Sequence, residues 1–121
     1  MTRKEITGVR DLSFSSWVRQ KLPDSSTGFM ATDVDFFLYN YKTKDIVILE
    51  IKTRNGSVKK WQRIFYKNLN KWIKNGISDD WTYHGVYLLQ FEKTCFEDGK
   101  CYLNKNEITE DDLIKKLSFY E

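Results

Sequence analysis

Residues 34–52 show the clearest hydrophobic pattern in the chain, with two apolar runs on either side of a polar segment. The first run, residues 34–39, is rich in β-branched and aromatic side chains, which favour strands. The second run, residues 46–51, is almost wholly apolar, as in a strand that is covered on both faces. Residues 41–45 between the runs suit a short hairpin loop. The pattern therefore predicts two neighbouring strands that pair as a hairpin.

Three other segments have apolar residues at spacings of three and four, which predict helices. These segments are residues 12–22, 58–75 and 113–119. Ser13, Ser57 and Thr109 stand near their starts and are suitable N-caps. Pro23 and Gly76 suit the ends of the first two helices. Helices are therefore expected both before and after the strand pair.

Further strands are predicted on both sides of the hairpin. Residues 83–91 have an apolar centre and would pair beside the second run, so that the helix between them forms a βαβ crossover. Residues 29–31 could form a short strand, and residues 92–103 a hairpin around the Asp-Gly turn of residues 97–100. The element order predicts an α/β fold with a mixed sheet of four to five strands flanked by helices. Residues 1–121 are expected to form a single domain.

Composition agrees with a packed globule and excludes several classes of protein. The hydrophobic content is 40%, with four Trp, seven Tyr and eight Phe, so disorder is not expected. No stretch is apolar enough to cross a bilayer and no signal peptide is visible, which predicts a cytoplasmic protein with no membrane partner. Cys95 and Cys101 are too few for a zinc site or a four-cysteine iron–sulfur cluster. His84 is expected to be structural or exposed, because no acid or nucleophile is marked near it in the sequence.

Four charged residues interrupt the apolar strands and need an explanation. Asp33 and Asp35 stand at the first strand, and Glu50 and Lys52 at the end of the second. Because side chains alternate along a strand, aligned hairpin faces would bring Asp35, Glu50 and Lys52 together. One interpretation is a surface hairpin with a Glu-Lys ion pair, which contributes little to stability. The other is a divalent-cation site with the Lys52 amine beside it, and the cost of charge in apolar strands favours this second interpretation.

Asp35, followed after a gap by Glu50, Ile51 and Lys52, resembles the D…ExK signature of the PD-(D/E)XK nuclease superfamily. The resemblance covers residues 14–91. It implies a restriction-endonuclease-like core in which Asp35 and Glu50 hold Mg²⁺, with Mn²⁺ as a substitute. It also implies that Lys52 helps to activate the attacking water. The Ile51 carbonyl is a candidate third ligand.

The helix predicted after this motif carries Gln62 and Tyr66, one helical turn apart. Their spacing is similar to the QxxxY element of the RecB-type branch of the superfamily, in which the Gln lies near the metal and the Tyr near DNA. Many members also carry a metal-reaching Glu on the first helix, which residues 12–22 lack. Gln20 is the nearest polar residue there, and an exposed helix position is the simpler interpretation for it. Asp33 is the alternative source of an extra carboxylate.

The same helix also favours a contact with phosphate groups. It carries five cations at spacings of three and four, and no acid on the helix balances them. These cations are Lys60, Arg63, Lys67, Lys71 and Lys74. Plain solvation is the simpler interpretation, but a solvated face usually pairs charges of opposite sign. A phosphate backbone would stabilise such a row, and Arg54 would join it.

The sequence therefore predicts a Mg²⁺-dependent deoxyribonuclease. It would be an endonuclease that hydrolyses DNA with little sequence selectivity, or with a preference for branched or junction DNA. A homodimer would let so small a domain cut both strands, and a stand-alone nuclease suits a virus, acting in the host cytoplasm. Two alternatives stay open: a catalytically inactive nuclease-fold module that binds DNA or inhibits a partner, and a small ribonuclease.

Overall fold

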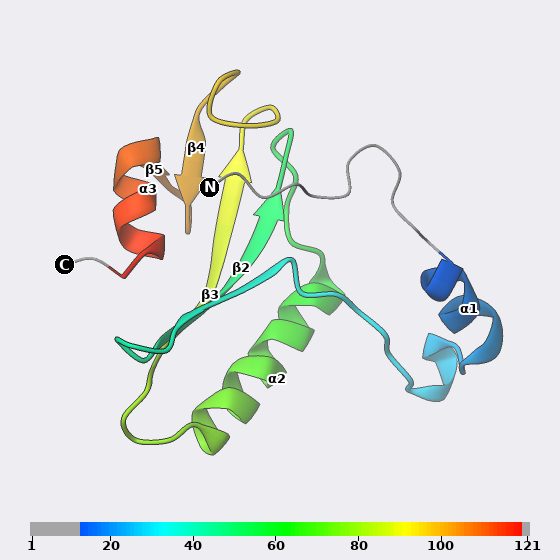
Figure 1. The fold of residues 1–121 in the computed structure, drawn as a ribbon. Helices are drawn as coiled ribbons and strands as arrows, with labels where there is room; N and C mark the ends of the chain where they lie inside the picture. Colours follow the sequence, from blue (N-terminus) through cyan, green and yellow to red (C-terminus); the bar gives the residue numbers. More distant parts are fainter. Residues whose placement is uncertain (1–12, 120–121) are drawn as a thin grey trace. The chain divides into compact units, whose positions relative to one another are not determined.

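The computed structural model describes residues 13–119, which contain three α-helices, a short 3₁₀ helix and five strands. Their order along the chain (Figure 1) is α1 (Ser13–Lys21), η1 (Ser25–Thr27), β1 (Phe36–Asn40), β2 (Asp45–Lys52), α2 (Lys60–Gly76), β3 (Thr82–Phe91), β4 (Cys101–Leu103), β5 (Asn106–Ile108) and α3 (Glu110–Leu117). The chain divides into two compact units, with the boundary after Asp33. The first unit holds α1 and η1, and the second holds the strands, α2 and α3.

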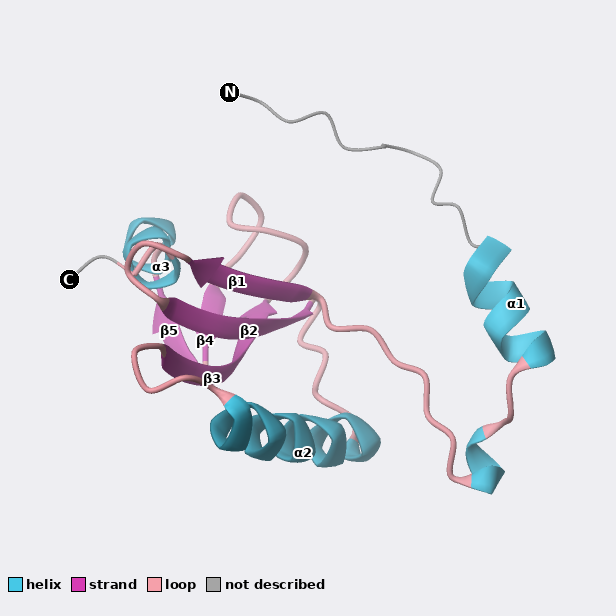
Figure 2. Cartoon of the chain, turned by 60° about the horizontal axis from the view of Figure 1, so that its bottom comes forward, coloured by secondary structure: helices cyan, strands magenta, loops and turns pink. Residues whose placement is uncertain are grey.

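The five strands form one mixed sheet in the order β1-β2-β3-β4-β5. β2 and β3 run parallel, with α2 as the connection between them, and the other three pairs are antiparallel. Figure 2 shows the sheet with α2 on one side and α3 on the other. The predicted α/β fold with a mixed sheet is therefore confirmed, as is the pairing of the two strands that α2 connects.

The two helices cover opposite faces of the sheet because successive side chains of a strand point in opposite directions. Leu49 of β2 packs in one cluster with Leu113 of α3, whereas the next residue, Glu50, contacts Tyr66 of α2. The main apolar core lies on the α3 face. Its buried members are Leu49, Leu89, Phe91, Cys101, Leu103 and Leu113.

The turn of the β1–β2 hairpin is closed by the side chain of Asn40. Its Oδ1 accepts hydrogen bonds from the backbone N–H groups of Lys42 and Thr43, at 2.9 and 3.0 Å. The Asn40 carbonyl accepts another from the N–H of Lys44 at 2.7 Å. Lys44 has a φ of 62°, in the left-handed region, and this lets the chain reverse into β2. The predicted short loop is confirmed.

Some local predictions are wrong. Residues 29–31 do not form a strand. The hairpin predicted within residues 92–103 is not formed: residues 92–100 are a loop between β3 and β4, and the Asp98 carboxylate folds this loop on itself by accepting the backbone N–H groups of Thr94 and Cys95. The tight turn instead joins β4 and β5 at Asn104 and Lys105, which have φ values of 50° and 73°. Two such residues form a primed hairpin turn, and this Asn-Lys pair lacks the glycine that usually marks one.

The helix starts are partly as predicted. Thr109 caps α3, because its Oγ1 accepts the backbone N–H of Asp112 at 3.2 Å. Ser57 is not the cap of α2; Lys59 is, and its backbone N–H donates to Gln62 Oε1 at 3.0 Å. The start predicted for the first helix at residue 12 lies outside the described residues. None of the helices within residues 13–119 has both the length and the hydropathy needed to cross a lipid bilayer.

The first unit is stabilised by local contacts. Phe14 and Trp17 of α1 stack with ring centroids 5.5 Å apart. Asp24 is the N-cap of η1, since its Oδ1 accepts the backbone N–H of Ser26 at 3.0 Å, and Gly28 ends the turn with a φ of 91°. Hydrogen bonds from Ser26 lower the pKa of Asp24.

Candidate active site

Among residues 13–119, Glu50 is the one charged residue that is buried, with 4% of its surface exposed. It follows Val47, Ile48 and Leu49, which are buried in the same strand. A carboxylate in such a position is costly unless other groups compensate its charge. The groups around Glu50 therefore decide the chemistry of this end of β2.

Three side chains surround the Glu50 carboxylate. Gln62 Nε2 donates to Oε1 at 3.0 Å, and the Tyr66 hydroxyl donates to Oε2. Lys52 Nζ lies 3.4 Å from Oε1 and also donates to Gln62 Oε1 at 3.0 Å. Within residues 13–119, every buried side-chain nitrogen or oxygen has a hydrogen-bond partner. The four side chains thus form a closed network, which we call the Glu50 network.

The Glu50 network also anchors the start of α2. Gln62 Oε1 accepts both the Lys52 amine and the backbone N–H of Lys59, the cap of the helix. One side chain therefore links the first turn of α2 to the end of β2. This double role explains why α2 starts at Lys60 and not after Ser57, because Gln62 then occupies the third helical position.

Tyr66 is a hydrogen-bond donor in this network at neutral pH. Burial raises its pKa well above the ordinary value, and the hydrogen bond to Glu50 and the charges of Glu50 and Asp35 raise it further. The hydroxyl therefore keeps its proton at neutral pH and continues to hold Glu50 in place.

Asp35 lies immediately before β1 and is exposed. Because β1 begins opposite Leu49, the residues of β2 after Leu49 extend beyond its first residue. The Asp35 carboxylate replaces the missing strand at that point, since its Oδ2 accepts the backbone N–H of Ile51 at 2.8 Å. Asp35 is thereby held at the residue between Glu50 and Lys52. That these side chains hold a metal stays a prediction.

The chemistry of this donor set suits one hard divalent cation. Asp35 and Glu50 offer carboxylate oxygens, which Mg²⁺ prefers, and Mg²⁺ in proteins usually keeps several water ligands. Within residues 13–119 no group of three or more His, Cys, Asp and Glu side chains gathers to hold a metal. The two carboxylates would therefore be the protein's side-chain ligands, completed by backbone oxygen and water. Glu50 would have to loosen its contact with Lys52 or Tyr66 to bind the ion.

The other predicted residues are exposed at the surface. Asp33 is the last residue of the first unit and is exposed. Arg54 is exposed in the turn after β2, with a φ of 53°, and its backbone N–H donates to the carbonyl of Lys93 at 2.8 Å. The five predicted phosphate-binding cations of α2 are all exposed. They are Lys60, Arg63, Lys67, Lys71 and Lys74.

Gln90 was not predicted from the sequence, yet it supports the site. It lies directly opposite Lys52 in the parallel β2–β3 pair. Its Nε2 donates to the carbonyl of Gly56 at 3.0 Å, which ties the turn after β2 to the sheet. A glutamine at the end of an apolar strand was the available signal, but its register against Lys52 could not be known.

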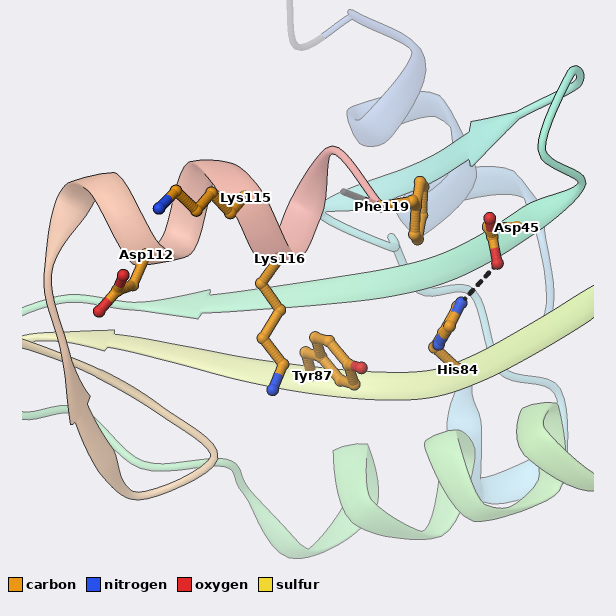
Figure 3. A pocket seen from close by; sticks show the side chains of 7 residues that line it. All are labelled: Asp45, His84, Tyr87, Asp112, Lys115, Lys116 and Phe119. Carbon is orange, nitrogen blue, oxygen red and sulfur yellow. Dashed lines mark hydrogen bonds and ion pairs between the residues drawn. The ribbon is translucent and has the colours of Figure 1, made fainter. Parts of the chain in front are cut away.

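His84 is paired with an acid that the sequence did not indicate. Its Nε2 lies 2.8 Å from Asp45 Oδ1, and its ring stacks on Phe119 with centroids 5.3 Å apart. Figure 3 shows Asp45 and His84 joined across β2 and β3, with Lys116 extending from α3 toward Tyr87. These four residues help to line a pocket with a volume of about 510 Å³. It belongs to the α3 face and is separate from the Glu50 network.

An irregularity in β3 places His84 beside Asp45. The register between β2 and β3 shifts between Ile46 and Ile48, and the extra residue falls at His84 and Gly85. Gly85 has a φ of 102°, which glycine adopts without strain. Bulges of this kind redirect neighbouring side chains. Periodicity predicted β3 as a regular strand, so this pairing could not be foreseen.

Comparison of the chain with protein-family models, with curated proteins and with solved structures gives no match. A functional proposal therefore rests on the geometry of the Glu50 network and of α2, the helix that carries Gln62 and Tyr66.

Proposed function

We propose that this protein is a Mg²⁺-dependent endonuclease of the PD-(D/E)XK type, which hydrolyses phosphodiester bonds of DNA with little sequence selectivity. The observation that carries the proposal is the buried Glu50 carboxylate, held by Gln62 and Tyr66, with Lys52 Nζ 3.4 Å away. Asp35 is bonded to the backbone between Glu50 and Lys52. Two carboxylates and an amine at one end of a strand pair are the groups that metal-assisted hydrolysis needs.

Each residue of the site has a distinct role in this proposal. Bound to Asp35 and Glu50, Mg²⁺ would act as a Lewis acid and lower the pKa of a coordinated water. Gln62 and Tyr66 position the Glu50 carboxylate, because each donates to a different oxygen. The Lys52 amine orients the attacking water or stabilises the charge that develops on the phosphate.

The cations of α2 would hold the substrate. Lys60, Arg63 and Lys67 are exposed on the same helical turns that carry Gln62 and Tyr66. Contacts with phosphates position a nucleic acid without reading its sequence. We therefore expect binding to weaken steeply as the salt concentration rises. We also propose that the protein acts inside the cell, or in the host cytoplasm if it is viral. It would act there as a homodimer.

The test is a cleavage assay with labelled single-stranded, duplex and branched DNA and with RNA, each with Mg²⁺ or with EDTA. We expect DNA cleavage only with Mg²⁺. The Lys52→Ala variant should lose cleavage and keep binding, whereas Lys100→Ala, an exposed cation elsewhere, should cut like the parent. Equal cleavage by Lys52→Ala and the parent would overturn the proposal.

A second candidate function is a non-catalytic module that binds DNA or inhibits a partner. It is favoured by the closed Glu50 network, in which Lys52, Gln62 and Tyr66 compensate the carboxylate without an ion. This module would be identified if the protein bound DNA but cleaved no substrate, and if Glu50→Gln bound DNA as tightly as the parent. Cleavage confined to RNA would instead identify a ribonuclease.

A further inference from the structure

The outward side of α2 exposes three large apolar side chains. Trp61 is 42% exposed, Ile64 54% and Trp72 60%. The other side of the same helix is turned toward the sheet, where Tyr66 is buried. Apolar side chains that are exposed together on one side of a helix are typical of a binding surface.

The two tryptophans lie on the same side of α2. They are separated by eleven positions, which is close to three full helical turns, or about 16 Å along the axis. Asn68 lies between them, and Ile64 lies between the tryptophans and the cations. The exposed cations follow the neighbouring side of the helix. They are Lys60, Arg63, Lys67, Lys71 and Lys74.

Charge determines what can cover this surface. α2 carries no Asp or Glu, so the helix repels a second copy of itself and attracts an anionic partner. The same surface offers flat aromatic faces beside the cations. Cations that track a backbone, combined with aromatic side chains for stacking, are the two features of single-strand nucleic-acid binding.

We propose that the outward side of α2 binds single-stranded nucleic acid, with phosphates on the cation row and unpaired bases stacked on Trp61 and Trp72. This inference rests on the proposed nuclease function and names its preferred substrate as single-stranded DNA or a single-stranded segment of branched DNA. Bases in a duplex stack on one another and do not expose their faces. A duplex would therefore engage the cations alone and leave both indoles uncovered.

The position of α2 connects this surface to the candidate active site. Trp61 is the neighbour of Gln62, which donates to Glu50, and Arg63 follows directly. A strand bound along the helix would thus reach its first turn, where the Glu50 network begins. The stacked bases would fix the register of the phosphate that meets Lys52.

The experiment measures binding to the Lys52→Ala protein in EDTA, so that cleavage does not interfere. Fluorescence anisotropy is recorded with a labelled oligothymidylate and with a labelled duplex of the same length. We expect the single strand to bind at least about tenfold more tightly. Trp61→Ala and Trp72→Ala should each weaken single-strand binding by about tenfold and leave duplex binding unchanged.

Matched variants separate stacking from other effects. Trp72→Phe keeps an aromatic face and should retain most of the single-strand binding. If the substitutions acted by disturbing the fold, Trp72→Phe would weaken binding as well. Lys71→Ala should weaken single-strand and duplex binding alike. Trp17→Ala removes an exposed indole from a different helix and should change neither.

Equal affinity for single strand and duplex, with no effect of either tryptophan variant, would overturn the inference. So would a dimer in sedimentation velocity that Trp72→Ala converts to monomer, because a second copy would then be the occupant. The two proposals fail separately. Tryptophan-dependent single-strand binding without cleavage contradicts the nuclease alone, whereas Mg²⁺-dependent cleavage confined to duplex contradicts the single-strand preference alone.

Discussion

The two faces of β2 contrast at neighbouring residues. Leu49 and Glu50 are equally buried, each with 4% of its surface exposed. Leu49 packs among apolar side chains below α3, including Leu89 and Leu113. Glu50 faces α2 and is surrounded by hydrogen-bond donors and by Lys52. The same strand thus builds a stabilising core on one face and buries a charge on the other.

The two faces therefore contribute to stability in different ways. Apolar burial on the α3 face contributes about 25 cal/mol per Å². An ion pair such as that of buried Glu50 with partly buried Lys52 often contributes no more than an apolar pair of the same size would, because the charges lose most of their hydration. The Glu50 network is therefore poorly explained by stability alone. This supports, on physical grounds, the proposed catalytic role of the α2 face.

The sharpest way to break this comparison is Glu50→Gln. The amide keeps the shape of the side chain and removes its charge. We expect cleavage to fall at least about 10²–10³-fold, while the free energy of unfolding falls by only about 1–3 kcal/mol, because the amide still accepts one hydrogen bond and the Lys52 side chain stays 19% exposed to water. Single-turnover cleavage and urea unfolding measure the two effects. A large loss of stability would show that the Glu50 network is structural.

Leu89→Ala tests the opposite face. The substitution leaves a cavity in the apolar core, and we expect the free energy of unfolding to fall by about 2–5 kcal/mol. Urea denaturation followed by tryptophan fluorescence gives this value. At a temperature where the variant stays folded, its cleavage should match the parent. If Leu89→Ala lost as much cleavage as Glu50→Gln, the division between a stabilising face and a catalytic face would be contradicted.

Tyr66→Phe removes one donor from Glu50 and leaves the ring. We expect a loss of about 1–3 kcal/mol, because a hydrogen bond to a buried charged group is broken. The variant should also change the alkaline limb of the stability curve. The pKa of Tyr66 is raised above its ordinary value of 10.0, so its contribution is complete below about pH 10 and is lost as the pH rises further. The free energy of unfolding, measured at several pH values above 10, should therefore fall less steeply with pH for Tyr66→Phe than for the parent.

The smallest effect is expected for Asp45→Asn, on the α3 face at the other end of β2. Hydrogen bonds from Thr43 and His84 lower the pKa of Asp45 in the folded state. Its contribution to stability is therefore present above about pH 4 and is lost as the pH falls through its lowered pKa. Acid unfolding of Asp45→Asn should be less steep than that of the parent. Cleavage at neutral pH should not change, and a strong decrease would connect the two ends of the strand.

Local pattern predicted much of the fold. The hairpin, α2, β3 and α3 follow from apolar spacing, since the periods of strand and helix are short compared with each element. The shared face of Glu50 and Lys52 follows from the same alternation. The failures lie where one side chain overrides the pattern, as Gln62 does when it sets the start of α2, or where a turn lacks glycine, as at Asn104 and Lys105.

The sequence by itself determined that Glu50 and Lys52 share one face of an apolar strand and that a basic, aromatic helix follows them, because alternation and helical spacing are properties of neighbouring residues. Only the tertiary structure decided which distant groups meet these residues. Asp35 reaches the backbone of Ile51, and His84 reaches Asp45 from another strand through a shift in register. Contacts of this kind depend on the pairing of whole strands, which no local pattern encodes.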